Sequence, residues 1–200
     1  MRGKVGNKTA LANIRDKTED PFRVLVSTIL SARTRDLVTE RVSDQLFARY
    51  PDVKELSKAK FVSVAKIIRP VNYYRGKTKK IIAASKQIVS RFNGVVPNSY
   101  DELLELSGVG RKTAGCVLVY GFNLPAIPVD VHVHRISNRI GLVKTKEPEE
   151  TEMALRTIYG RKDWLAVNEL FVSFGQTTCL PRKPKCNACS IREMCDYARN

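Results

Sequence analysis

Residues 106–114 read Leu-Ser-Gly-Val-Gly-Arg-Lys-Thr-Ala and place two glycines, Gly108 and Gly110, between two helical patterns. Glycine adopts a positive φ and permits close backbone approach at little steric cost, so this stretch predicts a tight turn that joins two helices. The second helix begins at Arg111 and directs free N–H groups outward beside the side chains of Arg111 and Lys112. Together these groups would form a binding site for one DNA phosphate, although an ordinary interhelical turn is the more frequent interpretation of this pattern taken alone.

Apolar residues recur at helical spacing along most of the chain, and no segment alternates clearly with period two. Asp20 is expected to cap a helix that has Pro21 in its first turn, and Thr34 to cap the next one. Ser99 and Glu102 have the spacing of a capping box at the start of the short helix before the turn. Further helices are expected at residues 61–68, 81–92, 131–140, 149–158 and 163–174. The predicted fold class is all-α.

The composition is strongly basic, because 35 Lys and Arg oppose 20 Asp and Glu and leave the 200-residue chain with a net charge of +15. Such an excess attracts polyanions by counterion release, which indicates nucleic acid; a basic surface that serves solubility or thermal stability explains the charge equally well. The sequence contains no apolar run of about eighteen residues and no signal-peptide core. We therefore expect a cytoplasmic, nucleoid-associated monomer that does not contact membrane.

Four of the five cysteines lie close together near the end of the sequence, with the spacing Cys-x6-Cys-x2-Cys-x5-Cys. They are Cys179, Cys186, Cys189 and Cys195. Thiols clustered in this way in a chain with no export signal indicate a metal or cluster site rather than a disulfide framework. Zinc sites usually contain two short Cys-x-x-Cys or Cys/His pairs, and this sequence contains only one such pair, Cys186 and Cys189. The fifth cysteine, Cys116, lies in an apolar run and is expected to be a small buried residue.

The turn and the cysteine spacing resemble those of the endonuclease III family of base-excision DNA glycosylases, whose hairpin reads Leu-Pro-Gly-Val-Gly-Arg-Lys-Thr-Ala. The only difference in this stretch is Ser107, which replaces the proline. The segments Leu30-Ser31-Ala32 and Val129-Asp130-Val131-His132 extend the resemblance. It runs from about Phe22 to Cys195 and covers nearly the whole chain.

The resemblance implies a bifunctional glycosylase and AP lyase that removes oxidised pyrimidines from duplex DNA and cleaves the strand 3′ to the abasic site. Lys112 would attack the sugar C1′, expel the damaged base and hold the opened sugar as a Schiff base that permits β-elimination. Asp130 matches the family's essential aspartate and would stabilise the cationic sugar and relay protons, although a helix N-cap is the simpler role for it. His132 and His134 are expected only to pack or to form hydrogen bonds, since no third ligand or partnered carboxylate accompanies them.

The cysteine spacing also matches the [4Fe-4S] cluster of the family, which would be structural and would position DNA. Two prolines stiffen the loop between the first two expected ligands, and its basic residues would contact the DNA backbone. These residues are Arg182, Lys183 and Lys185.

Two positions depart from the pattern of the familiar bacterial enzymes. Arg33 stands where those enzymes carry glutamine, and Tyr73 stands where they carry an apolar wedge. Both side chains are suited to insertion into DNA, with Arg33 hydrogen-bonding the orphan base and Tyr73 stacking on a neighbour. A surface arginine and a half-buried aromatic are the simpler interpretations, and the opposite-base preference stays open.

Related enzymes and other protein classes supply the alternatives. Mismatch glycosylases that excise adenine carry serine at the Lys112 position, and those that excise thymine carry tyrosine there. The adenine-specific enzymes also carry a further C-terminal domain, for which we expect no room in this sequence. A non-catalytic iron–sulfur DNA-binding module is disfavoured by the presence of both Lys112 and Asp130, and a redox protein by the lack of a flavin or dinucleotide fingerprint.

The expected architecture has two lobes with DNA in the cleft between them. A helical barrel would span residues 20–125, with the hairpin at about residues 100–122. A cluster lobe would combine residues 1–19 with residues 126–200.

Overall fold

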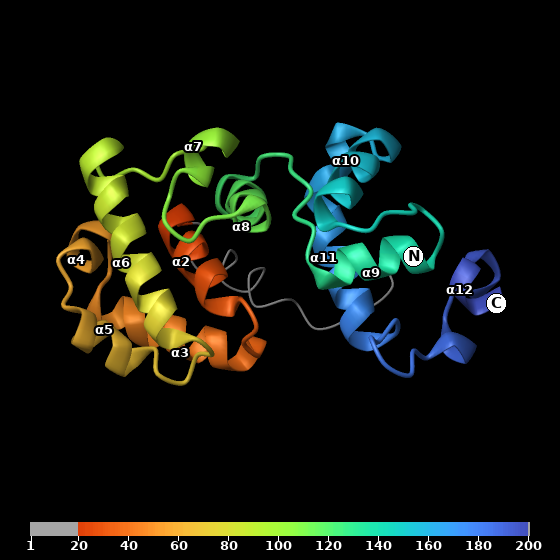
Figure 1. Cartoon of the computed structure of the whole chain (residues 1–200), viewed down its shortest axis with the longest axis horizontal. Helices are drawn as coiled ribbons and strands as arrows, with labels where there is room; N and C mark the ends of the chain where they lie inside the picture. Colours follow the sequence, from red (N-terminus) through yellow and green to blue (C-terminus); the bar gives the residue numbers. More distant parts are fainter. Residues whose placement is uncertain (1–19, 200) are drawn as a thin grey trace. The chain divides into compact units, whose positions relative to one another are not determined.

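The structure is a computed structural model, and it describes residues 20–199 (Figure 1). The regular elements in this range are all helical and none is a strand, which confirms the all-α fold class for these residues. They divide into two compact units, residues 20–124 and 125–199. Residues 1–19, which we expected in the cluster lobe, lie outside the described range. Within that range no helix has the length and apolar character that crossing a membrane requires.

The first unit is built around the apolar helix α2, whose side chains are nearly all buried. Figure 1 shows α2 between α6 and α8, and it also contacts α3 and the π-helical segment η1. Asp20 caps α2 as predicted, since its Oδ1 accepts a hydrogen bond from the Phe22 N–H at 2.9 Å and Pro21 occupies the first turn. The elements are α2 (Pro21–Ser31), α3 (Asp36–Arg49), α4 (Val53–Ser57), α5 (Phe61–Ile67), α6 (Tyr74–Arg91), α7 (Tyr100–Leu104), α8 (Arg111–Cys116) and η1 (Val117–Gly121).

The second unit packs α9 against α10 and α11 around a small apolar core. That core contains Ile127, Val129, Val133, Val143, Leu155 and Val167. The segment with the four clustered cysteines follows α11 and forms short turns of helix. The elements are α9 (Val131–Arg139), α10 (Pro148–Ile158), η2 (Arg161–Asp163), α11 (Trp164–Thr177), η3 (Cys186–Ala188), η4 (Arg192–Met194) and α12 (Asp196–Arg199).

One predicted cap is wrong, and a second is correct in position only. Helix α3 begins at Asp36 after Arg35, so Thr34 is not its N-cap; the Thr34 hydroxyl instead accepts a hydrogen bond from Lys77 at 3.2 Å. Ser99 does precede α7, but its side chain makes no capping hydrogen bond. The Thr34 prediction failed because a partner 43 residues away takes the side chain that the local pattern assigned to the cap.

Helices α9 and α11 approach closely at Gly175. A Cβ atom at this position would lie 2.4 Å from Nδ1 of His132 and 3.0 Å from Cδ1 of Ile136, so only glycine fits. Gly76 in α6 has no atom within 4 Å of the same imaginary Cβ. The two helical glycines therefore differ in what they do: Gly175 sets the contact between two helices, and Gly76 does not.

Replacement of these glycines by alanine is expected to change stability in opposite directions. Gly175→Ala should lower the free energy of unfolding by about 1–3 kcal/mol through overpacking. Gly76→Ala should raise it by up to about 1 kcal/mol, because alanine restricts the unfolded chain and favours helix. Urea denaturation followed by circular dichroism measures both effects. A Gly175→Ala variant as stable as wild type would show that residue 175 does not limit how closely α9 and α11 pack.

Candidate functional site

The two hairpin glycines have different roles. Gly108 has φ +82°, and a Cβ there would lie 2.8 Å from Cβ of Lys80, so both the conformation and the contact with α6 require glycine. Gly110 is the N-cap of α8 with φ −107°, and a Cβ there would meet nothing within 4 Å. The protein's own packing does not need glycine at Gly110, which leaves space for a ligand to approach the start of α8.

Arg111 and Lys112 are the first two residues of α8, and both are half-buried. The Arg111 guanidinium lies 5.4 Å from the ring centroid of Tyr100, whose hydroxyl donates to the Arg111 carbonyl at 3.3 Å. Lys112 makes no hydrogen bond or ion pair with any residue in the range 20–199. Of these two side chains, therefore, only that of Arg111 is held by a contact within this range. The amine of Lys112 is not.

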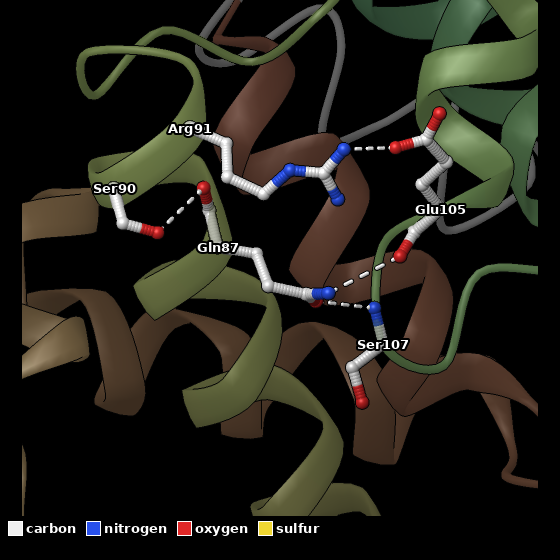
Figure 2. A network of polar contacts seen from close by, with 5 residues as sticks. All are labelled: Gln87, Ser90, Arg91, Glu105 and Ser107. Atoms are coloured by element: carbon white, nitrogen blue, oxygen red, sulfur yellow. Dashed lines mark hydrogen bonds and ion pairs between the residues drawn. The ribbon is translucent and has the colours of Figure 1, made fainter.

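A glutamine on α6 holds the backbone that leads into the hairpin (Figure 2). Oε1 of Gln87 accepts a hydrogen bond from the Ser107 N–H at 2.7 Å, and its Nε2 donates to the Glu105 carbonyl at 3.2 Å. Arg91 and Glu105 form an ion pair beside it, but both side chains are about half exposed, so that pair contributes little to stability. Gln87 thus supplies a partner for the N–H that Ser107 has and that a proline would lack.

The structure brings Arg33 and Tyr73 together, although 40 residues separate them. The Arg33 guanidinium lies 5.9 Å from the Tyr73 ring centroid and donates to the Tyr73 hydroxyl at 3.5 Å. Both residues have positive φ, 55° and 58°, which is unfavourable for side chains that carry a Cβ. Such strain often marks functional positions, and here it presents an exposed arginine and an exposed aromatic ring at one place on the surface.

In the second unit, Asp130 caps helix α9. Its Oδ1 accepts hydrogen bonds from the N–H groups of His132 and Val133 at 2.8 and 2.9 Å. Oδ2 accepts no hydrogen bond from the part of the chain that the structure describes, so one carboxylate oxygen is engaged and the other is not. The buried side chain of Asn168 donates to the Pro128 carbonyl at 2.7 Å and thereby fixes the segment that precedes Asp130.

The two histidines after Asp130 form hydrogen bonds, as predicted. Nδ1 of His132 lies 3.2 Å from the Arg135 guanidinium, and Nδ1 of His134 lies 2.7 Å from the Thr151 hydroxyl. These contacts tie α9 together internally and to α10.

The four clustered cysteines line a single cavity, together with the apolar side chains of Ile140, Phe174 and Ile191. None of the four forms a disulfide bond. Within residues 20–199 no three Cys, His, Asp or Glu side chains are close enough together to hold a single metal ion. The four thiols therefore share one cavity without forming a single-ion site among the described residues.

Two arginines of α9 anchor the cysteine segment. The Arg139 guanidinium donates to the carbonyls of Leu180 and Pro181 at 2.7 and 2.9 Å, and it also lies 3.6 Å from Sγ of Cys179. Arg135 donates to the Cys179 carbonyl at 2.9 Å. The loop held in this way exposes the basic residues predicted to contact DNA. They are Arg182, Lys183 and Lys185.

Several residues that hold these parts in place belong to no motif in the sequence. Gln87, Lys77, Asn168 and Arg139 all donate or accept hydrogen bonds with backbone 20 to 47 residues away. The sequence offers little signal for them, because Lys77 lies before the helix expected at residues 81–92. The structure buries the side chains of both Lys77 and Asn168. A polar side chain buried in this way must find a partner, and the partner is usually backbone.

Known proteins resemble most of the chain. The family model described as HhH-GPD superfamily base excision DNA repair protein matches residues 26–161. Endonuclease III of Thermotoga maritima is 48% identical over 183 residues, which cover 92% of this chain and 86% of that relative. A structure described as a trapped endonuclease III–DNA covalent intermediate with an estranged adenine matches with a TM-score of 0.87 and 31% identity, over 90% of this chain and 85% of that one. A thermostable thymine-DNA glycosylase shares the fold, with a TM-score of 0.82 and 23% identity over 95% and 94% of the two chains.

The hydrogen bond between Gln87 and Ser107 predicts a coupled pair of substitutions. Gln87→Leu should lower the free energy of unfolding by about 1–2 kcal/mol, because the partly buried Ser107 N–H loses its acceptor. In the Gln87→Leu/Ser107→Pro double variant this N–H is absent, so the loss should be smaller than the sum of the two single losses. Ser90→Ala, which removes an exposed neighbour, is the control. Additive effects in urea denaturation would show that the bond does not contribute.

Proposed function

This chain belongs to the endonuclease III family of the HhH-GPD superfamily, and we propose that it excises oxidised pyrimidines from duplex DNA with Lys112 as its nucleophile. Membership of this family makes it a bifunctional DNA glycosylase and AP lyase of base excision repair. The observation that carries the assignment of the nucleophile is the position of Lys112 at the start of α8, with no structural partner in the described range.

The proposed reaction uses the amine of Lys112 directly. The lone pair of its neutral Nζ forms a bond to the sugar C1′ while the bond from C1′ to the base breaks, and the base leaves with that electron pair and takes up a proton. Nζ then loses a proton, and its lone pair forms the C=N bond as the C1′–O4′ bond breaks. O4′ takes up a proton, so the sugar ring opens and leaves an imine that is protonated on nitrogen. Loss of a proton from C2′ then breaks the C3′–O bond, and the strand is cleaved 3′ to the abasic sugar. An amine held in an ion pair would be a poor nucleophile, so the lack of a partner for Lys112 favours this role.

Asp130 is proposed to act through its unengaged oxygen. The hydrogen bonds to Oδ1 orient the carboxylate at the start of α9 and leave Oδ2 to face developing positive charge on the sugar. The roles of N-cap and catalytic carboxylate are therefore compatible in one residue. Such a carboxylate can also accept a proton in the steps that follow departure of the base.

DNA contacts are proposed at three places. The open space at Gly110 and the N–H groups at the start of α8, beside Arg111, would receive a backbone phosphate. The exposed loop anchored by Arg139 would place Arg182, Lys183 and Lys185 near the DNA backbone. The adjacent side chains of Arg33 and Tyr73 would fill the gap left by the extruded base.

We propose that the cysteine cavity holds a [4Fe-4S] cluster rather than a single zinc ion. A zinc ion needs its thiolates to converge at about 2.3 Å from one centre, whereas a four-iron cluster separates them. The four free thiols share one cavity but do not form a single-ion site, and the remaining lining is largely apolar. Cys179, Cys186, Cys189 and Cys195 would hold the cluster, which supplies a rigid cross-link for the basic loop when bound.

Borohydride trapping tests the nucleophile. Wild type incubated with a duplex that contains one oxidised pyrimidine or abasic site should form a covalent adduct after reduction, and Lys112→Gln should form none. Asp130→Asn should slow base excision by about 100-fold or more while keeping the fold, because asparagine is an equally good N-cap. The readout is denaturing gel electrophoresis of labelled DNA.

Lys144→Gln, which replaces an exposed lysine outside the proposed site, is the control and should trap like wild type. Base release without trapping by wild type would make the enzyme monofunctional and Lys112 a phosphate contact. Binding without either reaction on any lesion would favour the non-catalytic DNA-binding module.

Metal analysis of the purified protein tests the cofactor. We expect about four iron atoms and four acid-labile sulfides per chain. Cys186→Ser should lose most of the iron, whereas Cys116→Ala, which changes the buried cysteine of the first unit, should retain it. One zinc ion per chain and no iron would contradict the proposed cluster.

A further inference from the structure

The first turns of α6 contain a lysine that the proposed mechanism does not use. Lys77 is 6% exposed, and its ammonium donates three hydrogen bonds. The acceptors are the carbonyls of Leu30 and Ala32, at 2.7 and 2.6 Å, and the hydroxyl of Thr34 at 3.2 Å. Burying an ammonium group is costly unless such partners are present, so this arrangement holds the charge in one place.

The acceptors lie on both sides of Arg33. Ala32 and Thr34 are its neighbours in the chain, and Leu30 belongs to the last turn of α2. Burial, and then the nearby charge of Lys80, lower the pKa of Lys77 to about 8, so the group is still charged at neutral pH. A cation near the end of α2 also interacts favourably with the helix dipole.

Lys77 is tied to the Tyr73 side as well. Its backbone N–H donates to the Tyr73 carbonyl at 3.1 Å in the first turn of α6, so the ammonium joins the turn that begins at Tyr73 to the segment that contains Arg33. Asn72 adds a second bond between the two segments, because its side-chain amide donates to the Arg33 carbonyl at 2.5 Å. Arg33 and Tyr73 both have positive φ, a conformation that persists only where surrounding contacts determine it. The bonds from Lys77 and Asn72 are such contacts.

We propose that Lys77 is a positioning residue that holds Arg33 and Tyr73 in the arrangement in which they insert into DNA. The inference rests on the proposed function, because it concerns the step at which the damaged base leaves the helix. Lys77 itself touches neither DNA nor the reacting sugar. It acts by fixing both segments before DNA arrives, so that ordering them does not oppose extrusion of the base.

The test compares two lysines of α6. Lys77→Met keeps the length and the apolar stem of the side chain and removes the ammonium, and Lys86→Met makes the same change at an exposed position. Three quantities are measured on folded protein: the single-turnover rate of base excision, the rate of borohydride trapping on a preformed abasic site, and the fluorescence of 2-aminopurine placed as the orphan base. An abasic site has no base to extrude, so trapping on it reports the chemistry of Lys112 with little demand for insertion.

For Lys77→Met we expect base excision to slow by about 10- to 100-fold while trapping on the abasic site stays within about threefold of wild type. The fluorescence change on binding should be smaller than in wild type. Lys86→Met should match wild type in all three measurements. Excision by Lys77→Met at the wild-type rate, or an equal loss of excision and trapping, would overturn the proposal. Failure of wild type to trap at all would instead overturn the proposed function.

Two milder variants keep the test decisive if Lys77→Met does not fold. Thr34→Val removes one acceptor of the ammonium, and Asn72→Ala removes the bond to the Arg33 carbonyl. Each should slow excision more than trapping, in the same sense as Lys77→Met. Wild-type excision rates in both variants would overturn the proposal.

Discussion

Gly108 lies against the side chain of Lys80 so closely that no larger residue fits, and this contact fixes the hairpin to helix α6. The rest of the first unit depends on the same helix. Gln87, further along α6, holds the backbone that enters the hairpin, and Lys77, nearer its start, holds the end of α2. One helix therefore sets the position of the proposed nucleophile and of the proposed DNA-inserting pair. Side chains that must act on one nucleotide need such common support, because an error of about 1 Å can cost 100-fold in rate.

Each unit combines strict local geometry with long-range polar contacts. In the second unit, the backbone N–H groups at the start of α9 orient Asp130, and Asn168 of α11 fixes the segment before it. At the other end of α9, Arg139 links this helix to the cysteine segment by a hydrogen bond. Helix α9 thus bears the proposed catalytic carboxylate at one end and an anchor of the proposed cluster loop at the other. A shift of α9 would therefore move both the proposed catalytic carboxylate and the proposed cluster loop.

Features determined by neighbours in the chain could be predicted from the sequence. The cap at Asp20, the start of α8 at Arg111 and the all-α class follow from local patterns, and the structure confirms them. Features determined by distant partners could not be predicted. Thr34 has the chemistry of an N-cap, yet the Lys77 ammonium takes its hydroxyl, and nothing near Gln87 in sequence indicates that it accepts a hydrogen bond from Ser107. The candidate catalytic residues rest on the family resemblance, whereas the spacing of the four cysteines indicates a metal or cluster site without it.

The central claim is that the amine of Lys112 becomes bonded to the sugar of the damaged nucleotide. It is tested most directly by digesting the borohydride-reduced protein–DNA adduct and locating the modified residue by tandem mass spectrometry. We expect the reduced sugar to be attached to Nζ of Lys112 and to no other lysine. Attachment at a different residue, or at several lysines in similar amounts, would contradict it.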